Sequence, residues 1–218
     1  MSNTYYLQKR SHLNLLRADV WRIESGVVRA TSWLEDGTTT LGFWGAGDVV
    51  GNVILRQENY QLECLTSVTA SPLLVENCPN LVMLAHIHQL QELLIIRSCK
   101  RIEEMLLKLL TWLGGRFGEA GETGVIFKTF LTHQDLAETL NTTRVTITRS
   151  MKQLERQGTI RHLANRQLFI ARSAYSSSDP APQKLVENLT TFTSHSSIIP
   201  LVGVAASRSN RPLSVSYR

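Results

Sequence analysis

Two short helical patterns joined by an asparagine constrain the fold of this chain more than any other feature of its sequence. Thr132 can cap the first helix, and Asp135, three residues later, can complete a capping box. Leu136 and Leu140 follow at i and i+4 and would face a core. Asn141 then lies where a tight turn needs a positive φ, which asparagine tolerates better than most residues. The segment therefore predicts a helix-turn-helix.

The second helix of this pair has an apolar and a polar face. Thr142 or Thr143 can cap it. Ile147, Met151 and Leu154 recur at i, i+4 and i+7 and would be buried. The polar positions that would face outward are Arg144, Thr148, Arg149 and Lys152. A cation in the first turn opposes the helix dipole, so Arg144 is unexpected there on grounds of helix stability, and contact with a DNA guanine would offset this cost.

A β-hairpin is predicted directly after these helices. Residues 158–163 and 167–170 are rich in strand-forming residues, and residues 164–166 form the turn between them. Arg161 and Arg166 on this hairpin, or wing, would reach backbone phosphates of a nucleic acid.

The net charge of the chain is concentrated in the same region. Residues 128–172 carry 8 Lys+Arg and 3 Asp+Glu, whereas residues 1–127 carry 11 and 13, and residues 173–218 carry 4 and 2. Because neutralisation of phosphates dominates affinity for nucleic acid, this local excess favours a module that binds a polyanion. On charge alone, a solvated basic face is an equal alternative.

The remaining sequence predicts an α+β protein with several parts. The predicted parts are an antiparallel, sensor-like β-roll (1–78), a long dimerisation helix (79–118), the winged helix-turn-helix (119–172) and a disordered serine-rich tail (173–218). The strands predicted in the roll are Val20–Ile23, Val27–Leu34, Thr38–Trp44, Val49–Leu55, Gln61–Ala70 and Leu73–Val75. Asp36-Gly37 between two β-rich runs is a strong hairpin signal. The long helix is predicted to end at Gly114-Gly115, and it can contain a break.

Seven-residue spacing of apolar residues along the long helix predicts a seam between two helices. The predicted dimer interface is Ile95, Ile102, Met105, Leu109 and Trp112. Ser98 falls on the same stripe, where a polar residue weakens a coiled coil. The alternative is that the stripe packs on the β-domain of its own chain.

The order of β-roll, long helix and winged helix-turn-helix over residues 20–172 resembles the cyclic-AMP-receptor/fumarate-nitrate-regulator (Crp/Fnr) family of bacterial transcription factors. Within this family, Thr-Arg-Val-Thr-Ile-Thr-Arg at 143–149 is most similar to the recognition helix of the cyanobacterial global nitrogen regulators. The resemblance implies a homodimer that reads an inverted repeat in double-stranded DNA and contacts RNA polymerase. It also implies more opening strands than the residues before Val20 provide, so we expect an incomplete roll or a truncated N-terminus.

The resemblance implies that Arg144, Val145 and Arg149 read bases and that Thr146 contacts a phosphate. The other backbone contacts that we expect are Thr132, Thr143, Thr148, Lys152, Arg161 and Arg166. An arginine can bind guanine O6 and N7, whereas a valine cannot accept a hydrogen bond from cytosine N4 and can only touch a thymine methyl. We therefore expect GTA-type half-sites opposed by TAC.

The effector that the resemblance implies is not identified by the sequence. Gly51-Asn52-Val53 stands where a cyclic-nucleotide pocket of this family has Gly-Glu-Leu, and Gln61-Leu62 stands where it has Arg-Ser. Because the phosphate would lack its countercharge, cyclic AMP is not expected to bind. Gln61 and His86 likewise replace the arginines of a 2-oxoglutarate pocket, and Arg56 and Arg97 remain as anion-binding candidates.

Several classes of protein are disfavoured. The longest apolar runs fall far short of the roughly 20 residues of a membrane-spanning helix, so we expect no membrane contact and a cytoplasmic protein. The three cysteines form no CxxC pair and the six histidines are scattered, so neither a metal site nor a cofactor is predicted. We expect no enzyme. The alternatives are a cupin-like metal-dependent enzyme and a constitutive DNA-binding protein without an effector.

Overall fold

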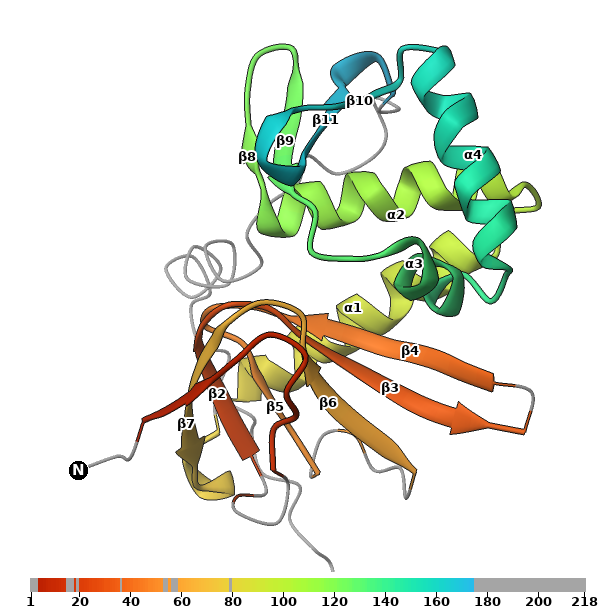
Figure 1. Cartoon of the computed structure of the whole chain (residues 1–218). Helices are drawn as coiled ribbons and strands as arrows, with labels where there is room; N and C mark the ends of the chain where they lie inside the picture. The colour runs from red at the N-terminus through yellow and green to blue at the C-terminus, as the bar shows by residue number, and fades with distance from the viewer. Residues whose placement is uncertain are drawn as a thin grey trace, which may run out of the picture.

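The computed structural model describes residues 4–14, 18, 20–35, 37–52, 55, 59–78 and 80–174. The helix-turn-helix part lies above a β-roll, and a pair of helices connects the two (Figure 1). The tail predicted to be disordered lies outside the described residues from position 175 onward.

Two antiparallel sheets form the β-roll. One sheet has the order β1 (Tyr5–Leu7), β7 (Val68–Leu73), β2 (Val20–Ser25), β5 (Val49–Gly51), and the other has the order β4 (Gly37–Trp44), β3 (Val28–Leu34), β6 (Tyr60–Cys64). Apolar side chains from both sheets, among them Trp21, Trp44 and Leu62, fill the interior of the roll. The fold class and the antiparallel roll were correctly predicted from the alternation of apolar residues and turn signals.

The structure adds one strand to the predicted roll and divides another. Before Val20, the strand Tyr5–Leu7 pairs with β7 along Val68–Ala70. The segment predicted as one strand, Gln61–Ala70, is two strands, since the chain turns at Leu65–Ser67, where the Thr66 hydroxyl accepts a hydrogen bond from the Val27 N–H at 2.9 Å. The far end of the predicted strand Val49–Leu55 lies largely outside the described residues.

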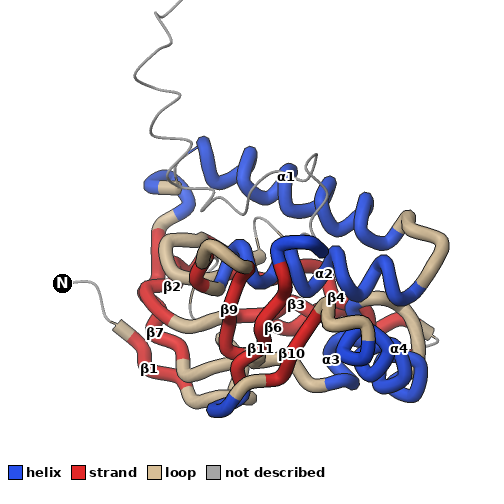
Figure 2. Tube along the Cα trace, turned by 90° about the horizontal axis from the view of Figure 1, so that it is seen from above, coloured by secondary structure: helices blue, strands red, loops and turns tan. Residues whose placement is uncertain are grey.

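The predicted long helix is two helices, α1 (Asn80–Arg97) and α2 (Ile102–Phe117). They are separated at Ser98–Arg101, where the Ser98 hydroxyl donates to the carbonyl of Ile95 at 2.8 Å. Figure 2 shows α1 running along one side of the molecule. The predicted end at Gly114-Gly115 is wrong, because Gly114 is buried against Val125 and α2 continues past it. Gly114 serves close packing and not helix termination.

The C-terminal part combines two helices with a small sheet. Its helices are α3 (His133–Thr139) and α4 (Arg144–Arg156), and its antiparallel sheet has the order β10 (Ile160–His162), β11 (Gln167–Ala171), β9 (Gly124–Lys128), β8 (Glu119–Ala120). Short 3-10 turns are Val75–Asn77, Ala164–Arg166 and Arg172–Ala174. Leu106, Leu109 and Leu113 of α2 share a core with Ile147 and Met151 of α4. Thus α2 packs as part of the helix-turn-helix unit.

Candidate nucleic-acid interface

Local hydrogen bonds fix the two helices of the helix-turn-helix. The Thr132 hydroxyl accepts from the Asp135 N–H at 3.1 Å, and the Asp135 carboxylate accepts from the Thr132 N–H at 2.7 Å, which confirms the predicted capping box. Asn141 has φ of 52°, as predicted for the turn. The Thr143 hydroxyl caps α4 by accepting from the Thr146 N–H at 3.2 Å. These bonds set where α3 and α4 begin, and the burial of Ile147, Met151 and Leu154 determines which face of α4 points outward.

A histidine without a predicted role, His133, connects α3 to α4. The Thr148 hydroxyl donates to the Arg144 carbonyl at 2.9 Å, so it accepts a hydrogen bond from Nδ1 of His133, also at 2.9 Å. Burial lowers the pKa of His133, and the nearby charges of His162 and Arg144 lower this pKa further. This hydrogen bond links α3 to α4 beside the core that the two helices share. A single histidine carries no sequence pattern that would have shown this contact.

The outward face of α4 forms a shallow hollow with cationic walls. The hollow is lined by Arg144, Val145, Thr148, Arg149 and Lys152. Val145 is 68% exposed although it is apolar, while Ile147 on the opposite face is fully buried. The three predicted base-reading residues therefore lie together on one open surface. This surface can present two guanidinium groups and one methyl-bearing side chain to a partner.

The predicted phosphate contacts fall into two groups. The hydroxyls of Thr132, Thr143, Thr146 and Thr148 take part in the internal hydrogen bonds of the motif. Lys152, Arg161 and Arg166 are exposed. The guanidinium of Arg161 lies over the ring of Phe169, 5.2 Å from its centroid, and this contact holds it on the wing.

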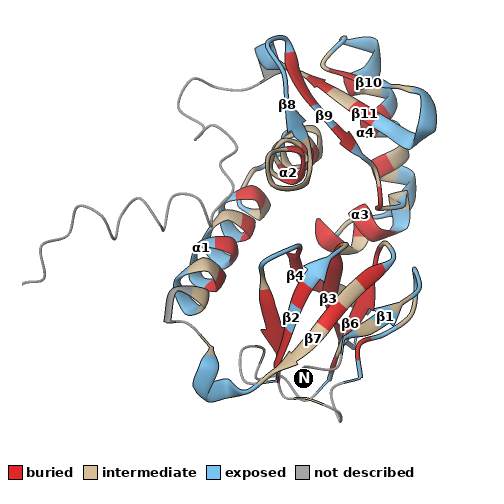
Figure 3. Ribbon diagram, turned by 90° about the vertical axis from the view of Figure 1, so that its left-hand side faces the viewer, coloured by how far each residue is buried: buried red, intermediate tan, exposed pale blue. Residues whose placement is uncertain are grey.

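The predicted dimer seam is only partly at the surface. Ile95 is 60% exposed, but Leu109 is fully buried in the core that α2 shares with α4, so its assignment to the seam is wrong. Ile102, Met105 and Trp112 are partly buried against the same core. Apart from Ile95, the apolar face that is exposed on α1 was not part of the predicted stripe. The exposed apolar residues of α1 are Met83, Leu84, Ile87, Leu90, Leu94 and Ile95. Figure 3 shows this side of α1 turned away from the sheets.

Two of the residues considered for an effector, His86 and Arg97, make hydrogen bonds within the chain. Nε2 of His86 lies 2.7 Å from the carbonyl of Val49, and burial lowers the pKa of this imidazole. The Arg97 guanidinium donates to the carbonyls of Thr139 and Thr40, so it is not an open anion site. Gln61 is partly exposed on β6. Arg56 and Val53 lie outside the described residues.

The described part of the chain holds neither a metal-binding cluster nor a membrane-spanning helix. Within these residues, no group of three or more histidine, cysteine, aspartate and glutamate side chains is arranged to hold a metal ion. Among the helices described, none has the length and apolar character needed to cross a membrane.

Comparison with known proteins places this geometry among transcriptional regulators. Residues 100–173 match the family model of the Crp-like helix-turn-helix domain, which includes α2. The regulatory protein CysR of Synechococcus elongatus is 38% identical over 158 residues, which cover 69% of this chain and 75% of that protein. The fold matches a Crp/Fnr family regulator of Thermus thermophilus, TTHA1359, with a TM-score of 0.61, 22% identity and coverage of 77% and 93% of the two chains. FixK2 of Bradyrhizobium japonicum matches with a TM-score of 0.63, 18% identity and coverage of 78% and 92%.

Proposed function

Because this chain belongs to the Crp/Fnr family of transcriptional regulators, we propose that it acts as a homodimer on an inverted repeat with GTA-type half-sites opposed by TAC. The observation that carries the proposal is the open face of α4, where Arg144, Val145 and Arg149 line one hollow. Its relatives are regulators, so the cupin-like enzyme considered from the sequence is not favoured.

The chemistry of the three side chains supports the choice of bases. A guanidinium group donates two hydrogen bonds to O6 and N7 of guanine, and this pairing discriminates by about 1–3 kcal/mol against another base. Val145 has no acceptor for the amino group of cytosine, but it can contact a thymine methyl. The likeness of residues 143–149 to the nitrogen regulators of cyanobacteria supports the same half-site.

The exposed face of α1 supports the homodimer. Met83, Ile87, Leu90 and Leu94 follow one another at spacings of four, three and four residues, which is the pattern of a two-helix seam. Large exposed apolar patches are uncommon on monomers and mark interfaces. We propose that α1 of a second copy covers this face, and that the seam lies on α1 instead of α2.

The partners proposed are double-stranded DNA, a second copy of the chain and RNA polymerase, in the cytoplasm. The effector is not assigned. Cyclic AMP is not proposed, because Gln61 offers no positive charge to the cyclic phosphate. Thermal-shift screening with cyclic nucleotides, 2-oxoglutarate and heme distinguishes a sensor from a protein that binds DNA constitutively.

Gel retardation with two operators tests the proposed reading. One operator carries the GTA/TAC repeat, and the other carries the TGTGA-type repeat with the same spacing and flanks. We expect tighter binding to the first operator, and weak, salt-sensitive binding to a scrambled duplex. Stronger retardation of the TGTGA repeat, or equal binding to all three duplexes, would refute the proposal.

A further inference from the structure

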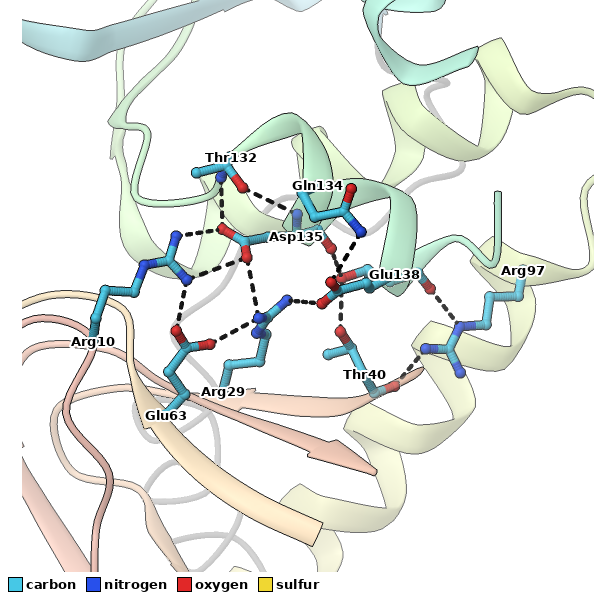
Figure 4. A network of polar contacts seen from close by, with 10 residues as sticks. Arg10, Arg29, Thr40, Glu63, Arg97, Thr132, Gln134, Asp135 and Glu138 are labelled. Atoms are coloured by element: carbon cyan, nitrogen blue, oxygen red, sulfur yellow. Dashed lines mark hydrogen bonds and ion pairs between the residues drawn. The ribbon is translucent and has the colours of Figure 1, made fainter. Parts of the chain in front are cut away.

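A buried arginine of the roll binds the first helix of the DNA-reading motif. Arg29 on β3 is 4% exposed. Its Nη2 lies 2.7 Å from Glu63 on β6 and 3.0 Å from Asp135 on α3, and its Nη1 lies 3.1 Å from Glu138, also on α3. Figure 4 shows these contacts crossing from the sheet to the helix. Arg29 therefore contacts two carboxylates of the reading motif and one of the roll.

A second arginine strengthens the same junction. Arg10 donates to Glu63 at 2.7 Å and to both oxygens of Asp135, at 3.2 and 2.8 Å. Asp135 is also the capping-box residue that receives the Thr132 N–H. The carboxylate that starts α3 is thus the one that holds this helix on the roll. A shift of this carboxylate would move the start of α3.

The other end of α3 is held as well. The hydroxyls of Thr40 on β4 and Thr139 on α3 lie 3.0 Å apart. Arg97 at the end of α1 donates to the carbonyls of both threonines. With contacts at its start and at its end, α3 has one orientation on the roll. Because His133 and a shared core couple α3 to α4, this orientation also sets the direction of the reading face.

Buried ion pairs of this kind contribute little net stability, because desolvation offsets their attraction, and in some proteins they instead select one arrangement among several. We propose that Arg29 is a positioning residue for DNA recognition, an inference that rests on the proposed function. It holds the helix-turn-helix at one angle to the roll, so that two copies of the chain present their α4 helices at one fixed separation. This separation corresponds to about one DNA turn, roughly 34 Å.

A series of operators with different spacers tests this role. The GTA/TAC repeat is built with spacers that differ by one base pair, and binding is measured for the full chain, for Arg29→Met and for the control Arg22→Met, an exposed arginine on β2. We expect the native chain and the control to prefer one spacer. The Arg29 variant should lose about five- to tenfold in affinity for that spacer and keep its affinity for scrambled DNA. Its spacer preference should be flattened, because its reading heads are no longer held at one angle. Simple loss of folded protein lowers all affinities equally, so an unchanged spacer preference overturns the proposal.

Two further measurements keep the test decisive. If Arg29→Met fails to fold, Arg10→Gln, at the more exposed of the two arginines, replaces it in the test. We expect its spacer preference to be flattened as well, but less than that of Arg29→Met. Hydrogen exchange of the α3 amides, read without DNA, should be faster in either variant while exchange in the core of α2 is unchanged. If exchange in α3 is unchanged in the variants, the positioning role is rejected, and this conclusion does not depend on DNA binding. If the native chain binds no inverted repeat, the proposed function is rejected separately.

Discussion

Arg144 lies in the first turn of α4, where its charge opposes the helix dipole, so helix stability does not account for its placement, whereas the proposed contact with guanine does. Arg144→Ala should reduce discrimination between guanine and other bases at one position by about 1–3 kcal/mol. Fluorescence titration with the operator and with a single-base variant of it measures this difference. If the loss is equal on the two duplexes, Arg144 does not read a base.

Arg161 on β10, which is proposed to contact a phosphate, provides the comparison with Arg144, which is proposed to read a base. The Phe169 ring supports its guanidinium at the wing surface, away from the hollow on α4. Arg161→Ala should weaken binding to all sequences alike and reduce the slope of log affinity against log salt by about one. The same titrations at four salt concentrations give the slope. A sequence-dependent loss would show that the wing reads bases.

At the scale of elements, local signals predicted α3 and α4 well and predicted the connecting helices poorly. A cap, a turn residue and an apolar face each act within a few residues, so Thr132, Asn141 and Ile147 could be assigned from sequence alone. The stripe through Leu109 is apolar for another reason: α2 packs on α4, which lies far along the chain. A seven-residue period does not tell which surface will cover it. Which apolar face of α1 stays exposed could be identified only once the packing of α1 and α2 on the rest of the chain was known.

A charge on that face tests the proposed seam. Leu94→Asp puts a carboxylate where a second α1 would bury it, and an unpaired buried charge is costly. We expect the dissociation constant of the dimer to rise by more than about tenfold. His88→Asp, at an exposed position of the same helix that is not one of the proposed seam residues Met83, Ile87, Leu90 and Leu94, should leave the dimer intact. Sedimentation equilibrium measures both variants, and a dimer that tolerates Leu94→Asp would exclude this seam.

Gly114 tests why α2 continues past its glycine pair. A Cβ at this position would lie 2.9 Å from Val125 Cγ1 and 3.3 Å from Phe127 Cδ1. Alanine gains about 1 kcal/mol in helix propensity, while overpacking of a tight core costs about 1–3 kcal/mol. We therefore expect Gly114→Ala to lower the free energy of unfolding modestly, as measured by urea denaturation. Stabilisation would instead mean that β9 can move away from α2 without cost.

At the scale of the whole molecule, the junction between roll and reading motif was beyond sequence reasoning. Arg10 and Asp135 are separated by 125 positions, and Arg29 and Glu138 by 109. No local period links such residues, and Asp135 was already explained by its cap. The sequence therefore predicted both halves of the molecule and said nothing about the angle between them, which is the quantity that a dimeric reader of an inverted repeat must control.

The same junction predicts how stability depends on pH. Burial alone would raise the pKa of Asp135 and of Glu63. At Asp135, hydrogen bonds from Arg10 and Thr132 outweigh burial and lower the pKa below its ordinary value of 3.8. At Glu63, hydrogen bonds from Arg10 and Arg29 outweigh burial and lower the pKa below its ordinary value of 4.5. A carboxylate whose pKa is lower in the folded state stabilises the fold above its ordinary pKa, and this contribution is lost as the pH falls through the folded value. The melting temperature should therefore be steady near neutrality and fall as the solution is acidified below about pH 4.

Arg10→Gln should make that acid dependence shallower. The variant removes one guanidinium from both carboxylates, so their folded pKa values lie closer to the unfolded ones and fewer protons are taken up on unfolding. Melting curves between about pH 6 and pH 3 compare the native chain with this variant and with Arg22→Gln, whose nearest carboxylate oxygen, on Glu24, is 4.0 Å away at the surface. The control should follow the native curve. If all three curves have the same slope, the two carboxylates do not titrate with folding, and the ion pairs between roll and reading motif do not form in solution.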